Sequence, residues 1–177
     1  MQVWDAGKEI NSLMSESNFT KGRFQLCLLL DGNLVLNTRD LATDFAYGAY
    51  YETGTNNPAD NVGKQVVYSE SGDMYVLREN GSEFDLINQP GTLKSTKNYY
   101  QRATLNYNGL LTWYSYPRAS TGCLGIGWSE IQSVPDNICM SITSYENVFD
   151  SGACGYNSIC NIDEKKNLYV NAHRITL

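Results

Sequence analysis

The feature that most restricts the fold is a unit of two apolar runs joined by a glycine turn, which occurs three times. The units cover residues 24–36, 65–77 and 102–114, and their turns contain Gly32, Gly72 and Gly109. In the first unit Asp31-Gly32 joins the runs, and this dipeptide favours a type I′ turn because both central residues of that turn need a positive φ. The sequence therefore predicts three β-hairpins.

The three units are in register with one another. Aligning the turn glycines brings large side chains into coincidence on both sides of the turn: Leu28, Tyr68 and Leu105 before it, and Leu34, Met74 and Leu111 after it. The two-residue period of a strand places these side chains on one face of each sheet. One hairpin cannot bury such a face alone, whereas three can do so around a pseudo-threefold axis. We therefore expect an all-β prism, with a β-sandwich of unrelated hairpins as the alternative.

Composition narrows the class of protein. Apolar residues make up 42% and charged residues 18% of the 177-residue chain, which suits a folded domain with a real core. The formal net charge of -6 disfavours nucleic acid and anionic membranes as partners. No apolar run approaches the roughly 18 residues that span a bilayer, so we expect no membrane insertion by this chain. Its first residues lack the pattern of a signal peptide, so an extracellular protein with this start would be a fragment or a truncated product.

Several linked motifs resemble one known family. They are residues 22–26 with 31–35, 70–75 with 80–82, 102–105 with 116–117, 135–139 and 152–160. In this order they resemble the extracellular region of plant G-type lectin S-receptor-like serine/threonine kinases. The resemblance covers about residues 2 to 163.

This resemblance implies a fold and a division into parts. The fold would be a bulb-type lectin-like β-prism with a truncated cysteine-rich tail. The expected parts are a prism domain at 1–118, a connector at 119–138, an incomplete EGF-like module at 139–163 and a tail at 164–177. The family's kinase would lie outside this chain, which contains no Gly-rich ATP loop, His-Arg-Asp or Asp-Phe-Gly motif. We expect a non-catalytic protein without a cofactor, placed on the extracellular face of the plasma membrane or secreted.

The resemblance also suggests a sugar site. Bulb-type lectins bind mannose through a strand motif Gln-x-Asp-x-Asn-x-Val-x-Tyr, whose polar side chains hydrogen-bond the hydroxyls of a hexose. The first repeat keeps three of these positions as Asp31, Asn33 and Val35, while Leu29 and Asn37 replace the Gln and the Tyr. The motif positions are further replaced in the other repeats: Ser69, Ser71, Asp73, Tyr75 and Leu77 in the second, and Asn106, Asn108, Leu110, Thr112 and Tyr114 in the third. The alternative for Asp31-Gly32-Asn33 is a purely structural turn.

The five cysteines are an odd number, so at least one has no partner within the chain. Family order in the EGF-like module implies a disulfide between Cys139 and Cys160 and leaves Cys154 without a partner. We expect Cys27 to be a buried thiol on a strand and Cys123 to lie in the connector. Because the module is incomplete, residues after about 139 are expected to be poorly ordered.

Other candidate sites are few. Asn18-Phe19-Thr20 and Asn80-Gly81-Ser82 are sequons, which predicts N-glycosylation at Asn18 and Asn80. The single histidine, His173, lies in the tail, where we expect a solvated residue rather than a catalytic one. No metal site is expected, because no calcium loop is present and Cys-x5-Cys is not a usual zinc spacing. Tyrosines are enriched near 47–51 and 99–100, where they either pack in the core or form an interface.

The sequence is consistent with three functional hypotheses. The leading hypothesis is a recognition module of a receptor-like kinase that binds an extracellular or cell-surface protein. The alternative is a mannose-type carbohydrate-binding domain with one degenerate site at Asp31, Asn33 and Val35. A third reading is the ectodomain of a full-length receptor kinase, whose catalytic output this chain could not perform. Association through the prism, with itself or another chain, is also expected.

Overall fold

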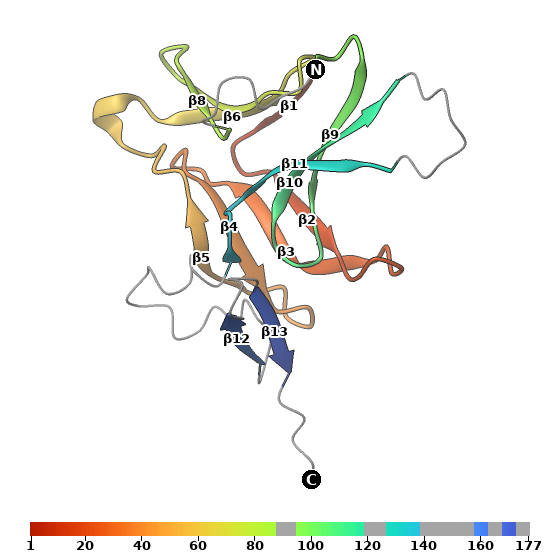
Figure 1. Cartoon of the computed structure of the whole chain (residues 1–177). Helices are drawn as coiled ribbons and strands as arrows, with labels where there is room; N and C mark the ends of the chain where they lie inside the picture. The colour runs from red at the N-terminus through yellow and green to blue at the C-terminus, as the bar shows by residue number, and fades with distance from the viewer. Residues whose placement is uncertain (88–94, 119–126, 139–157, 163–167, 173–177) are drawn as a thin grey trace.

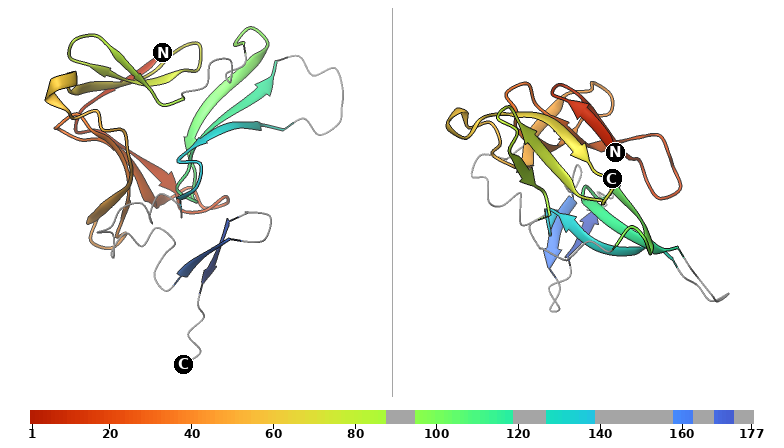
Figure 2. Two further views of the ribbon diagram at one scale, coloured as in Figure 1. Left: turned by 60° about the vertical axis from the view of Figure 1, so that its left-hand side comes forward. Right: turned by 90° about the horizontal axis from the view of Figure 1, so that it is seen from above.

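The computed structural model describes residues 1–87, 95–118 and 127–138 with their side chains, and the backbone of residues 158–162 and 168–172 (Figure 1). Strands dominate, and they form three antiparallel sheets that stand as the sides of a triangle around a shared interior (Figure 2). A separate two-stranded pair follows near the C-terminus. The all-β prism expected from the three repeats is confirmed.

The first sheet has the strand order β2-β3-β4-β5. Its strands are β2 (Glu9–Leu13), β3 (Lys21–Leu28), β4 (Leu34–Arg39) and β5 (Ala46–Glu52). The predicted hairpin is the central pair β3–β4, and each of its strands gains one outer partner. A short 3-10 helix, η1 (Pro58–Asp60), follows on the way to the second sheet.

The second sheet has the order β1-β6-β7-β8. Its strands are β1 (Gln2–Asp5), β6 (Gly63–Tyr68), β7 (Met74–Arg78) and β8 (Glu83–Asp85). The first strand of the chain therefore pairs with the second repeat before the chain enters the first sheet. The N-terminal segment therefore connects the second sheet, through β1, to the first sheet, through β2.

The third sheet has the order β11-β10-β9, from β9 (Tyr99–Leu105), β10 (Leu111–Pro117) and β11 (Ser129–Val134). β11 lies within 119–138, the segment expected to be a connector, and it pairs with β10 from Leu111↔Val134 to Ser115↔Ser129. The segment thus contributes a strand to the prism.

The three central hairpins share one register. Leu28 pairs with Leu34, Tyr68 with Met74, and Leu105 with Leu111. Five of these side chains are buried, and Tyr68 packs against the same core. The prediction that all six face the interior is confirmed. A fully buried leucine contributes about 1.5–3 kcal/mol, so these pairs are a large part of what closes the prism.

The turns differ from the predicted type I′ form. Gly32 donates its N–H to the carbonyl of Leu29 at 3.0 Å, and Leu29 donates to Asn33 at 2.9 Å. Gly32 has a φ of 88°, whereas Asp31 is not among the positive-φ residues. This is the three-residue loop in which a type I turn precedes a glycine bulge. The I′ expectation is wrong because only the last loop residue takes the left-handed conformation, and Gly72 and Gly109 repeat the pattern.

Each turn glycine also touches the next sheet. A Cβ on Gly32 would lie 2.5 Å from the nitrogen of Gly63 on β6. A Cβ on Gly72 would collide with Gln101 on β9, and one on Gly109 would lie 2.7 Å from the ring of Phe24 on β3. The first turn therefore packs on the second sheet, the second on the third, and the third on the first. This cyclic contact gives the prism its pseudo-threefold closure.

The C-terminal pair joins β12 (Ser158–Ile162) to β13 (Leu168–Ala172). It connects the end of the proposed EGF-like module to the proposed tail. Cys123, Cys139 and Cys154 lie outside the described residues, and so does most of the segment expected to be poorly ordered. The side chain of Cys160 on β12 is likewise outside the description. Cys27 lies on β3 with a free thiol, but it is half-buried rather than buried as expected.

Candidate functional site

The predicted sugar residues lie at and after the first turn. Asp31 is exposed, and its Oδ1 accepts the N–H of Asn33 at 2.9 Å while its Oδ2 accepts Nδ2 of Asn56 at 3.0 Å. Asn33 and Val35 are 4% and 5% exposed. The structure thus brings Asp31 and Asn33 together at the turn, while Val35 is covered within the sheet.

Both ends of the Asn33 amide are hydrogen-bonded inside the protein. Its Nδ2 donates to Oε2 of Glu52 at 3.0 Å. Its Oδ1 accepts the N–H groups of Gly54 at 2.9 Å and Thr55 at 3.3 Å, and the hydroxyl of Thr53 at 3.3 Å. This side chain therefore fixes the segment after β5 against the turn. A sugar at this position would have to displace buried hydrogen bonds, which is costly.

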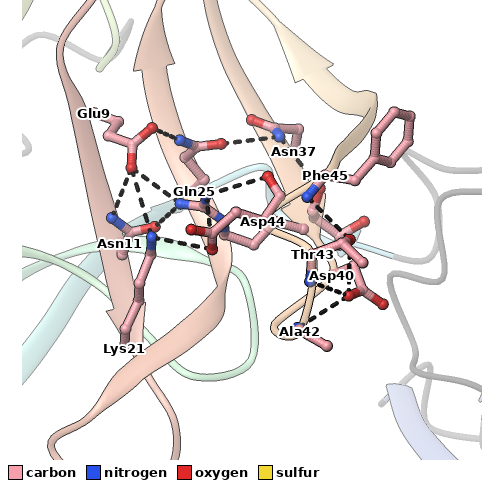
Figure 3. A network of polar contacts seen from close by, with 12 residues as sticks. Glu9, Asn11, Lys21, Gln25, Asn37, Asp40, Ala42, Thr43, Asp44 and Phe45 are labelled. Atoms are coloured by element: carbon pink, nitrogen blue, oxygen red, sulfur yellow. Dashed lines mark hydrogen bonds and ion pairs between the residues drawn. The ribbon is translucent and has the colours of Figure 1, made fainter.

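A network of polar side chains covers one face of the first sheet (Figure 3). Asn37, which stands at the motif's Tyr position, donates to Oε1 of Gln25 at 3.1 Å, and Gln25 donates in turn to Glu9. The guanidinium of Arg39, buried on β4, pairs with Glu9 at 3.0 Å and with Asp44 at 3.1 Å. The network joins β2, β3 and β4 to the loop after β4.

The residues of this network change the pKa of the Glu9 carboxyl. Burial raises its pKa, but hydrogen bonds from Asn11 and Arg39 and the charges of Arg39 and Lys21 together lower the pKa below its usual value. Burial, followed by the charge of Glu9, raises the pKa of the Cys27 thiol. A neutral thiol is a poor nucleophile, so the arrangement suits structure rather than catalysis.

The corresponding positions of the second repeat form a small closed ring. Ser69 and Ser71 hydroxyls lie 2.7 Å apart, and Ser69 donates to Oδ2 of Asp73 at 3.2 Å. Ser71 also donates to Asp73. These exposed groups satisfy one another across the turn.

The third repeat carries a different surface. Asn106 donates to the hydroxyls of Thr112 and Tyr114, both at 2.8 Å. Beside them the guanidinium of Arg102 lies over the rings of Trp128 and Tyr114, at 4.4 and 5.1 Å from their centres. Sequence reasoning did not find Arg102 or Trp128, because they meet only when β11 joins the sheet.

This surface continues along the sheet. The rings of Tyr116 and Trp128 lie 5.6 Å apart, and Arg118 lies 4.4 Å from the ring centre of Tyr100. Tyr100 and Trp128 are 50% and 41% exposed. Cross-strand pairing of Tyr114 with Arg102 and of Tyr116 with Tyr100 places these residues on one face. We call this set the aromatic–arginine surface: Tyr100, Arg102, Tyr114, Tyr116, Arg118 and Trp128.

Other predicted sites can be located in part. Asn18 and Asn80 are exposed on turns, where each side-chain oxygen accepts a backbone N–H two residues on. Among the described residues no group of His, Cys, Asp and Glu could hold a metal ion. His173 lies outside them. The part of the chain that the structure describes contains no helix with the length and hydrophobicity that crossing a bilayer requires.

Comparison with known proteins gives the family context. No protein-family model matches the chain. It is 33% identical over 94% of its length to G-type lectin S-receptor-like serine/threonine-protein kinase LECRK3 of Oryza sativa subsp. indica, covering 20% of that protein. It is 32% identical over 92% of its length to the similarly described RLK1 of Arabidopsis thaliana, covering 18%. A solved structure, Japanese Marasmius oreades lectin, aligns with a TM-score of 0.42 at 13% identity, over 76% of this chain and 90% of that one.

The chain therefore spans about a fifth of the relatives it matches. The two relatives described above are from Oryza sativa and Arabidopsis thaliana, which are plants. The curated homologues of this chain are plant G-type lectin S-receptor-like serine/threonine-protein kinases.

Proposed function

We propose that this chain is a non-catalytic recognition module of a receptor-like kinase, acting on the extracellular side and binding a protein or receptor partner. The observation that carries the proposal is the aromatic–arginine surface on the third sheet. Tyr, Trp and Arg are the residues most enriched where interface binding energy concentrates. The relatives' description as receptor-like kinases supports a role on the recognition side of a receptor.

The aromatic–arginine surface is preorganised in the free chain. The guanidinium of Arg102 lies over the rings of both Tyr114 and Trp128, and we expect these two contacts to restrict the motion of an otherwise flexible side chain. An ordered side chain loses less entropy on binding. Among the described residues, the ion pairs include neither Arg102 nor Arg118. Their charges therefore suit a partner that presents carboxylates, even though the chain as a whole is acidic.

The test is binding to a panel of purified plant receptor ectodomains, measured by surface plasmon resonance. Wild-type chain should bind at least one ectodomain, and Trp128→Ala or Arg102→Ala should weaken that binding about 30-fold or more. Tyr107→Ala is the matched control, because Tyr107 is 45% exposed and lies past the other end of β9. Binding that is unaffected by both Trp128→Ala and Arg102→Ala would contradict the proposal.

Carbohydrate binding is the second candidate, favoured by the relatives' description as lectins and by the exposed carboxylate of Asp31. It is tested by a glycan array followed by calorimetric titration with mannose. Saturable mannose binding that is lost in Asp31→Ala would place sugar recognition first. The third reading, the ectodomain of a full-length kinase, is compatible with either ligand.

A further inference from the structure

The third sheet has one strand fewer than the other two. In the first two sheets the central hairpin is flanked on both sides, by β2 and β5 around β3–β4 and by β1 and β8 around β6–β7. In the third sheet the hairpin β9–β10 gains only β11, which lies beside β10. Within the part of the chain that the structure describes, the outer edge of β9 therefore has no strand partner. By the pseudo-threefold symmetry, the missing strand is the counterpart of β1 and β2.

A surface groove marks the place where that strand would lie. It measures about 480 Å³ and is lined by residues of β1, β2 and β9. On β9 the lining includes both Arg102 and Ala103, which point to opposite faces of the sheet, so the groove runs along the edge of the strand. The exposed N-terminal residue also lines the groove, which therefore opens to solvent.

The backbone of β9 is oriented to receive such a strand. Asn106 donates its N–H to the carbonyl of Leu110 at 2.9 Å, so these two residues form a hydrogen-bonded pair across the hairpin. Hydrogen-bonded and non-hydrogen-bonded pairs alternate along an antiparallel ladder. Ala103, three residues earlier and paired with Trp113, is therefore in a pair of the second kind. Its N–H and C=O groups point away from β10, toward the groove.

The two complete sheets indicate which side chain belongs inside the groove. Leu26, Val66 and Ala103 occupy equivalent positions when the turn glycines are aligned. Ile10 on β2 is paired with Leu26, and Trp4 on β1 is paired with Val66. Ile10, Trp4 and Ala103 all line the groove. The missing strand should therefore place a large apolar side chain opposite Ala103, beside the other two apolar partners.

The next position along the strand, on the outer face of the sheet, favours a carboxylate. Gln25, Gln65 and Arg102 are equivalent in the three repeats. Gln65 donates to the carboxylate of Asp5 on β1 at 2.7 Å, and Gln25 donates to that of Glu9 on β2. The ion pairs among the described residues do not include Arg102. A residue directly opposite Arg102 would have its Cβ about 4.5–5.5 Å away, close enough for a carboxylate to reach the guanidinium.

We infer that the partner protein contributes the missing strand. This inference rests on the function proposed above and specifies which part of the partner binds. The segment is extended and antiparallel to β9, and it is four to five residues long, as β1 and β2 are. It contains a large apolar residue followed directly by Asp or Glu. In this mode of recognition main-chain hydrogen bonds supply affinity, and alternate side chains supply specificity.

A capped synthetic peptide, Thr-Val-Thr-Leu-Asp-Thr, tests the inference on the full chain. Labelled with fluorescein, it should bind saturably in a 1:1 ratio, as measured by fluorescence anisotropy. Replacing its Asp by Asn should weaken binding about 2- to 5-fold, the range expected for an exposed ion pair. Ala103→Pro removes the N–H that faces the groove, a change that an edge strand tolerates, and should weaken binding about 3- to 10-fold. Ala46→Pro, at the first position of the edge strand β5, is the matched control and should leave binding unchanged.

Hydrogen exchange locates the peptide in the wild-type chain, whatever the variants do to folding. The peptide should slow exchange of the Ala103 amide and leave the amides of β5 unchanged. Absence of saturable binding, or binding that does not slow exchange at Ala103, would overturn the inference. Protection of Ala103 that rises with the concentration of the chain alone would also overturn it, because a second copy would then occupy the groove.

The ectodomain assay separates this inference from the proposed function. A partner whose binding depends on Trp128 but is unaffected by Ala103→Pro would overturn the added strand and leave the proposed function standing. Peptide binding at Ala103 without binding of any ectodomain would support the strand site and contradict the proposed function.

Discussion

The hydroxyl of Tyr50 donates a hydrogen bond of 2.6 Å to the carbonyl of Gly109, joining the last strand of the first sheet to the turn of the third repeat. The Tyr50 side chain is fully buried, and its ring meets that of Phe24 edge-on at 6.0 Å. Phe24 is also the residue against which Gly109 packs. These three residues therefore lock the first side of the prism to the third.

Removing the hydroxyl should weaken this lock. Tyr50→Phe keeps the ring and leaves the buried carbonyl of Gly109 without this donor, which costs about 1–3 kcal/mol. The free energy of unfolding, from urea titration followed by circular dichroism, should fall by that amount. Tyr47→Phe, on the same strand but half-buried, should change it by less than about 0.5 kcal/mol.

Tyr50 should also make the fold sensitive to alkali. Burial raises the pKa of Tyr50 far above its ordinary value, although the charge of Arg23 opposes this. Between about pH 10 and the folded pKa, the unfolded chain loses the proton and the folded protein keeps it. The contribution of Tyr50 to the free energy of unfolding is therefore complete below about pH 10. It declines as the pH rises above that value, by up to about 1.4 kcal/mol per pH unit. Unfolding titrations from pH 9 to 11 should show a shallower decline in Tyr50→Phe, and an identical slope would contradict this account.

Turn glycines should differ according to what surrounds them. Gly109 and Gly81 have φ values of 86° and 84°, but a Cβ would meet Phe24 and Ile138 at the first and nothing within 4 Å at the second. Gly81→Ala should therefore cost about 1–2 kcal/mol from backbone strain alone. Gly109→Ala adds a steric clash and should cost clearly more. Equal melting temperatures for the two variants would argue against the packing of Gly109 on the first sheet.

The network on the first sheet should matter for stability. Arg39→Met leaves Glu9, whose side chain is 42% exposed, without the guanidinium that lies 3.0 Å away, and losing an ion pair with one partner this exposed should cost about 1 kcal/mol. Lys21, 3.9 Å from Glu9, should offset part of that loss. Since the pKa of Glu9 is lowered in the fold, its stabilisation is present above about pH 4.3 and lost as pH falls through the folded pKa. Acid unfolding of Glu9→Gln should show less of this pH dependence than the wild type.

Substitutions of Asn33 and Asp31 should affect stability to different extents, because Asn33 is buried and Asp31 is exposed. Asn33→Ala removes four hydrogen bonds in a buried setting and should destabilise the chain by about 2–3 kcal/mol. Asp31→Ala, at an exposed position, should cost less than about 1 kcal/mol. Thermal unfolding of both variants checks this order, and the reverse order would mean that Asn33 is not a structural anchor.

The fold was largely predictable, because the aligned turn glycines already placed Leu28, Tyr68 and Leu105 in one register. The pairing of β1 with β6 and of β11 with β10 was not predictable from the repeats, since both strands come from outside them. The turn type was also missed, because Asp-Gly suits two loop lengths and the choice depends on the hydrogen bond that Leu29 accepts.

The candidate site was less accessible from sequence. The motif match located Asp31 and Asn33, but it could not reveal that Glu52, Gly54 and Thr55 use the Asn33 amide. Tyr100 lies in a Tyr-rich stretch that the sequence predicts to be either core or interface. Its grouping with Arg118 and Trp128 depends on side chains from separate strands meeting on one face, which no local pattern shows.

The central claim is that recognition uses the aromatic–arginine surface rather than a sugar site. The most direct measurement is the affinity of the chain for its ectodomain partner after that partner's glycans have been removed enzymatically. The account predicts that affinity is retained, also in excess mannose, and falls about 30-fold or more in Trp128→Ala. Affinity that disappears with the glycans or in excess mannose, and that survives Trp128→Ala, would contradict it.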